Sequence, residues 1–87
     1  NLKIGTEYAN RLRTQLEGNK YASKFNPIDF DKAVSAAYNY KGENFAKDVL
    51  DKYKPKSMKD LLHRAYIPAE TRRQIRVVGR QLGKVGR

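Results

Sequence analysis

Apolar residues recur at spacings of three and four along most of this chain, and that periodicity limits what the chain can fold into. Three residues near the start follow one another at intervals of four: Tyr8, Leu12 and Leu16. Four residues near the end follow at intervals of three, four and three: Ile75, Val78, Leu82 and Val85. Such spacings place the apolar side chains on one face of an α-helix. The sequence therefore predicts a mainly α-helical domain of four or five helices.

Capping residues, glycines and prolines set the limits of these helices. Thr6 is a candidate N-cap, Asn26 precedes a proline as at many helix starts, and Ser57 opens a variant of the capping box. The helices that we expect lie at residues 6–18, 26–42, 43–53, 57–68 and 68–87. A short strand from Gln74 to Val78 is the alternative near the end of the chain, because β-branched residues favour a sheet.

Positive charge is concentrated in the last third of the chain. The 87 residues carry 19 Lys and Arg against nine Asp and Glu, which gives a formal net charge of +10. Residues 55–87 hold nine of the basic residues, six of the eight arginines and only two of the acids. Arginine suits bidentate recognition of phosphate. A charge of this size points to a nucleic acid, an anionic membrane surface or an acidic protein partner.

Several classes of protein are disfavoured by what the chain lacks. It has no cysteine, so it has neither disulfides nor a thiolate metal site. A single histidine and no clustered carboxylates argue against a multi-histidine metal nuclease, and we expect no cofactor. No apolar run approaches the roughly 18 residues that span a bilayer. We expect residues 1–87 to form one basic domain, and the start at Asn1 rather than methionine suggests a fragment of a longer protein.

The candidate active site lies where the fourth and fifth helices meet. His63 is near the end of one helix, Thr71 and Arg72 are near the start of the next, and Pro68 turns the chain between them. RNA carries its own nucleophile, the 2′-hydroxyl, so its cleavage needs a proton-transfer group and groups that hold the charged phosphate. Histidine is suited to moving the proton, and Asp60, one turn earlier, could orient its ring. Arginine and threonine side chains can hold the phosphate.

Other residues of this segment are candidates for substrate binding or for the second proton transfer. Glu70 and Tyr66 are the candidates for the second proton-transfer group. Tyr40 and Tyr66 are the tyrosines best suited to stacking on a base, because the others lie at core spacing. A lone histidine is also common as an ordinary surface residue, so both interpretations of His63 stay open. The substrate-binding candidates share the basic segment: Arg64, Tyr66, Arg73, Arg76, Arg80 and Lys84.

The cluster from His63-Arg64 to Thr71-Arg72-Arg73, with the high charge and the absence of cysteine, resembles the C-terminal nuclease domains of bacterial competition toxins. These belong to the contact-dependent growth inhibition and colicin-like group. The resemblance implies a metal-independent ribonuclease that cleaves tRNA in the cytoplasm, after delivery from a secreted or surface parent protein. It also implies an acidic immunity protein as partner, and some members use a translation elongation factor. Many members have a barnase-like α/β fold, whereas this sequence offers at most one strand.

A second hypothesis is a helical module that binds DNA or RNA without chemistry. The amphipathic basic helix expected from Pro68 to Arg87 favours it, because such a helix can lie along a phosphate backbone or in a major groove. A structural piece of a virion or ribosome is a third, weaker hypothesis. The cleavage of tRNA, with and without cell extract, separates the first hypothesis from the second.

Overall fold

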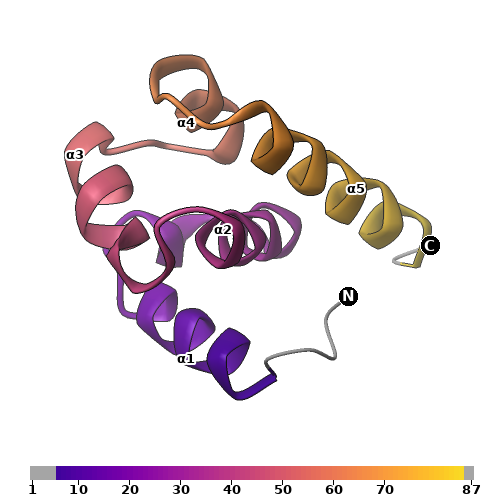
Figure 1. Cartoon of the computed structure of the whole chain (residues 1–87), viewed down its shortest axis with the longest axis horizontal. Coiled ribbons are helices and arrows are strands. Elements are labelled where there is room, and N and C mark those ends of the chain that lie inside the picture. The colour runs from indigo at the N-terminus through magenta and orange to yellow at the C-terminus, as the bar shows by residue number, and fades with distance from the viewer. Residues whose placement is uncertain (1–5, 86–87) are drawn as a thin grey trace.

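The computed structural model describes the backbone of residues 6–85 and the side chains of residues 7–78. It is a mainly helical domain, as predicted (Figure 1). The α-helices are α1 (Thr6–Glu17), α2 (Pro27–Asn39), α3 (Asp51–Tyr53), α4 (Met58–Arg64) and α5 (Ala69–Val85). Three short helical segments complete the order: the 3₁₀ turns η1 (Ala22–Lys24) and η2 (Gly42–Asn44) and the π-helical η3 (Ala46–Leu50).

No strand occurs within residues 6–85. The stretch from Gln74 to Val78, for which a strand was the alternative, lies inside α5. Ile75 is buried and Val78 is half-buried, whereas Arg76 is exposed. Three-residue spacing therefore puts the apolar side chains on the face of α5 that meets the core, and this tertiary contact overrides the β-propensity of single residues.

The central element is α2, and Figure 1 shows it between α1 on one side and α5 on the other. Its inward positions are small: Ala33 and Ala36 are fully buried, and Ala37 is 1% exposed. Small side chains allow neighbouring helices to approach closely and leave the larger core residues to the surrounding elements. The largest fully buried side chains come from those elements: Phe45, Leu12, Leu16, Leu50, Met58 and Leu61.

Two of the predicted helix starts are confirmed by their side-chain caps. The Asn26 side chain accepts the backbone N–H of Asp29 at 2.8 Å, and the Ser57 hydroxyl accepts that of Asp60 at 3.1 Å. Each bond satisfies one of the N–H groups that a helix start leaves without an internal partner. Thr6 differs from its prediction, because it is the first residue of α1 and not the residue before it.

The helix predicted at residues 43–53 is an irregular succession of turns, and α2 ends at Asn39, before Gly42. Lys41 and Gly42 both have positive φ, 72° and 55°, so the chain reverses here. A Cβ on Gly42 would collide with the hydroxyl of Tyr8. Glycine at this position is thus required by its backbone conformation and by the close approach of α1.

The fourth helix is shorter than predicted. It ends at Arg64, and Ala65 is already extended, with φ −95° and ψ 149°. The chain stays non-helical up to Pro68, in keeping with the steric restriction that proline places on the residue before it. Helical spacing therefore no longer predicts which side chains are buried after Arg64. In the extended stretch that follows, Ile67 is buried and Tyr66 is exposed.

Lys54 ends the irregular segment in the left-handed conformation, with φ 52° and ψ 55°. This conformation costs a non-glycine residue roughly 1 kcal/mol. Lys54→Gly is expected to raise the free energy of unfolding by about 0.5–1 kcal/mol. Lys52→Gly is the matched control, because it removes the same charge from a helical position and should lower stability by up to about 1 kcal/mol. Urea unfolding measures both, and equal destabilisation by the two variants would contradict this account.

Candidate nucleic-acid interface

The structure brings His63 and Arg72 together, as the sequence predicted. Both line an open groove bounded by α2, α4 and the first turn of α5. His63 lies on α4, and its side chain is exposed. The other residues that line the groove are Asp29, Lys32, Met58, Lys59 and Leu62.

The groove carries more positive than negative charge. Among the described side chains, neither Lys32 nor Lys59 has a carboxylate within ion-pair distance. The one acid of the groove, Asp29, accepts the backbone N–H of Met58 at 3.3 Å and so holds the start of α4. Two ammonium groups without an ion-pair partner among the described side chains thus line the same groove as His63. Such a site attracts an anion.

Sequence reasoning missed both lysines of this groove. Lys59 precedes His63 by four residues, which places the two on one face of α4, so its position was accessible from helical spacing. Lys32 comes from α2, and nothing in the local sequence links it to His63. The packing of α4 against α2 creates that proximity.

Arg72 is held by the protein. Its Nε donates to the carbonyl of Ile67 at 3.0 Å, and its Nη2 donates to those of Leu62 at 2.7 Å and Ala65 at 3.3 Å. These acceptors lie at the end of α4 and in the loop that follows it. Arg72 therefore satisfies carbonyls that the helix end leaves open, and two of its three guanidinium nitrogens, Nε and Nη2, are engaged in these bonds.

Thr71 does not fit its predicted role as a phosphate ligand. Only 3% of the residue is exposed, because it lies on the face of α5 that meets the core. The predicted trio of His63, Arg72 and Thr71 is therefore reduced to one free side chain. The lysines of the groove are better placed than Thr71 to neutralise a phosphate beside His63.

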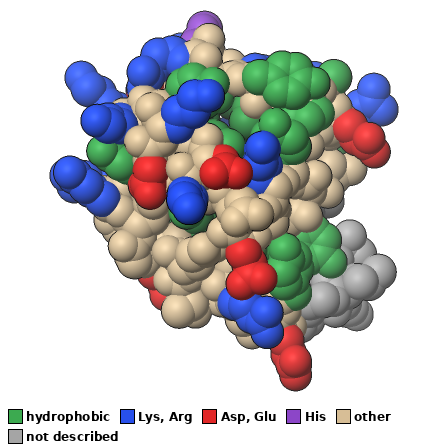
Figure 2. All heavy atoms as spheres, turned by 60° about the vertical axis from the view of Figure 1, so that its left-hand side comes forward, with side chains coloured by type: hydrophobic (Ala, Val, Ile, Leu, Met, Phe, Trp, Pro, Cys, Tyr) green, Lys and Arg blue, Asp and Glu red, His purple; other side chains and the backbone are tan. Residues whose placement is uncertain are grey.

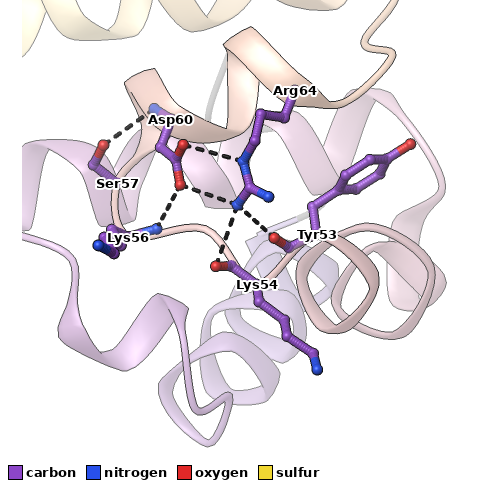
Figure 3. A network of polar contacts seen from close by, with 6 residues as sticks. All are labelled: Tyr53, Lys54, Lys56, Ser57, Asp60 and Arg64. Carbon is purple, nitrogen blue, oxygen red and sulfur yellow. Dashed lines mark hydrogen bonds and ion pairs between the residues drawn. The ribbon is translucent and has the colours of Figure 1, made fainter.

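Arg64, predicted to bind substrate, joins α4 to the preceding segment (Figure 3). Its Nε and Nη2 each donate to the carboxylate of Asp60 at 3.1 Å, and Nη2 also donates to the carbonyls of Tyr53 and Lys54. Asp60 also accepts the backbone N–H of Lys56 at 3.0 Å. The Arg64 guanidinium and this N–H hold the pKa of the Asp60 carboxyl below its usual value of 3.8. The carboxylate is thereby committed to this network.

Asp60 does not orient His63, contrary to the sequence-based prediction, because its carboxylate faces Arg64 on the other side. No hydrogen bond to the imidazole is found within the described residues. Figure 2 shows lysine and arginine side chains gathered at the upper left of one face, with the histidine protruding at the top. His63 is thus an accessible imidazole whose ring is not fixed by a carboxylate.

The exposed side of α5 supplies further cations. Arg73 and Arg76 are exposed, and neither forms an ion pair with a described side chain. Glu70, a candidate for the second proton transfer, is exposed in the first turn of the same helix. The side chains of Arg80 and Lys84 lie outside the described residues, although the backbone of α5 extends past both.

Comparison with known proteins does not assign this chain to a family. No family model matches the chain, and neither a curated protein nor a solved structure matches it. Within the part of the chain that the structure describes, no three His, Cys, Asp or Glu side chains are grouped as they would be around a metal ion. No described helix is both long and apolar enough to cross a membrane.

The contacts of Arg72 predict a stability effect that distinguishes it from its neighbour. Arg72→Met leaves three carbonyls without their donor and is expected to lower the free energy of unfolding by about 1–3 kcal/mol. Arg73→Met removes the same charge from an exposed position and should change stability by less than about 0.5 kcal/mol. Thermal unfolding of both variants checks this, and equal stability of the two would show that the Arg72 bonds contribute nothing.

The Asp60 network predicts a pH dependence of stability. A carboxyl with a lowered folded pKa stabilises the fold above its unfolded pKa and loses that contribution as the pH falls through the folded value. Asp60→Asn should therefore be less stable than the parent at neutral pH, and the gap should narrow below about pH 4. Urea unfolding across a pH series measures the gap. A gap that stays constant from neutral to acid pH would exclude this linkage.

Proposed function

We propose that this domain binds the phosphate backbone of RNA. The observation that supports the proposal is the uneven pairing of charge. Three of the four ion pairs among the described side chains lie within residues 11–48, whereas the described cations of the groove and of α5 have no acidic partner among those side chains. Lys32 and Lys59 belong to the groove, and Arg73 and Arg76 belong to the exposed side of α5. A surface of uncompensated like charges repels itself, and a polyanion relieves that repulsion.

Exposed lysines extend this surface beyond the arginines that the sequence analysis singled out. Lys54, Lys56 and Lys59 are exposed, and none forms an ion pair with a described side chain. They follow one another closely around the turn that leads into α4. An RNA backbone that crosses the start of α4 would therefore meet several cations. Phosphate contacts of this kind supply affinity without selecting a sequence.

Binding of this kind predicts a steep salt dependence. The logarithm of the RNA affinity should fall linearly with the logarithm of salt concentration, by about 0.7 for each phosphate contacted on a single strand. Arg76→Ala should weaken binding to all sequences and lower that slope by about one contact. Gln74→Ala is the matched control, because Gln74 is exposed on the same helix and carries no charge. Salt-independent affinity, or identical slopes for the two variants, would refute a backbone role for α5.

A second candidate function is ribonuclease activity, and the observation that favours it is that His63 lines the same groove as Lys32 and Lys59. In this proposal the imidazole of His63 takes the proton of the 2′-hydroxyl, and the 2′-oxygen attacks the adjacent phosphorus. The P–O5′ bond breaks, and the leaving 5′-oxygen takes up a proton. The two ammonium groups stabilise the charged phosphate. Arg72 fixes the loop next to the groove through its Nε and Nη2. The toxin resemblance then supplies tRNA as substrate, an elongation factor as activator and an acidic immunity protein that covers the cations.

Cleavage is tested with total tRNA in EDTA, with and without cell extract. His63→Ala should lower the cleavage rate by about 10²–10⁴-fold, the usual cost of losing a general acid or base. Its RNA affinity should stay close to that of the parent, because the cations supply the affinity. Cleavage at the parental rate by His63→Ala would remove the catalytic assignment. If the parent binds RNA but cleaves none under either condition, the domain is a binding module.

A further inference from the structure

Tyr66 is the most exposed large apolar side chain among those described, at 72%. The other exposed large apolar residues are much less exposed, with Ile28 at 41% and Tyr38 and Val77 at 38% each. A single exposed tyrosine is ordinary on a protein surface. The contacts around Tyr66 show that its exposure is built into the fold.

The backbone on both sides of Tyr66 is fixed. Ala65 and Ile67 are 5% and 3% exposed, so the residues before and after Tyr66 are anchored in the core. Arg72 donates to the carbonyls of the same two residues. Turning the Tyr66 ring inward by backbone rearrangement would break these bonds and expose Ile67. The loop therefore presents Tyr66 outward at little further cost in conformational entropy.

A second tyrosine supports the ring. Tyr40, the residue that ends α2, lies with its ring centroid 6.4 Å from that of Tyr66, at an interplanar angle of 73°. Tyr40 is half-buried and packs against the core. An edge-to-face contact covers at most one face of Tyr66, so at least one face remains open for stacking.

Positive charge lies beside this aromatic pair. The ammonium group of Lys41 lies 5.6 Å from the centroid of Tyr40, and it also forms an ion pair with Asp48 at 3.9 Å. Arg73 is exposed within the first two turns of α5, which begins three residues after Tyr66. An open aromatic face next to cations suits a ligand that carries both a planar base and a phosphate. Bases within a duplex have their faces covered by their neighbours, whereas unpaired bases do not.

We propose that Tyr66, supported by Tyr40, is a stacking platform for an unpaired base, so that the domain prefers single-stranded RNA to duplexes. This inference rests on the proposed RNA binding and adds the class of RNA. In this arrangement the cations hold the backbone of the strand, and Tyr66 receives one base from it. Stacking of this kind tolerates every base, because each has a π-face.

The test compares three probes that carry one negative charge per phosphate: a short oligouridylate, an abasic ribose-phosphate oligomer of equal length, and a blunt RNA duplex. Tyr66→Leu should weaken binding of the oligouridylate by at least about fivefold, since one stacked base is worth roughly 1–3 kcal/mol. It should not change the affinity for the abasic oligomer or for the duplex, nor the slope of log affinity against log salt concentration. Tyr66→Phe keeps the ring and should bind like the parent. Thermal unfolding verifies that both variants are folded.

The outcomes separate this inference from the proposed function. If the parent binds all three probes and Tyr66→Leu binds the oligouridylate as tightly as the parent, the platform is refuted while RNA binding stands. An equal loss for all three probes would also refute the platform, because it would show a general weakening of the surface. If the parent binds none of the probes at low salt, both the proposed function and the platform fail.

Discussion

The hydrogen bonds from the Arg72 guanidinium to three backbone carbonyls determine the geometry of the candidate interface. Leu62, Ala65 and Ile67 all direct their carbonyls to this one side chain. The bonds fix where α4 ends, how the loop leaves it and where α5 begins. His63 precedes that helix end and Tyr66 follows it, so the bonds of Arg72 help to fix the backbone positions of both. An arginine that binds backbone in this way can shape a site without touching the ligand.

Features determined by neighbouring residues could be predicted from the sequence. The caps at Asn26 and Ser57 depend on residues three positions away, and the face of α1 that carries Leu12 and Leu16 depends on the helical repeat alone. The end of α4 could not be found in this way, because the periodic pattern continues to Tyr66 and does not show that the backbone has already left the helix at Ala65. The sequence therefore predicted a fourth helix that continues to Pro68.

The roles of the arginines were harder to predict because backbone carbonyls leave no trace in a sequence. Arg64 and Arg72 look like neighbouring members of one basic cluster, yet their main acceptors are a carboxylate and carbonyl groups of this chain. Arg73, next to Arg72, forms no ion pair with the described side chains and is exposed. The distinction depends on which side of α5 each guanidinium occupies, and that follows from the packing of α5 against α2. The position of Lys32 in the groove likewise follows from helix packing, in this case of α4 against α2.

The seven residues of α4 are too few for a helix to persist alone in water, where about 12–15 are needed for even marginal stability. Polar bonds hold it at each end: Asp29 binds its first N–H, Arg64 ties it to the preceding segment, and Arg72 binds the carbonyls near its end. Its apolar side is held as well, because Met58 and Leu61 are among the largest fully buried side chains of the core. The element that carries His63 thus owes its helical form to the rest of the molecule, and it is expected to lose that form when the fold unfolds.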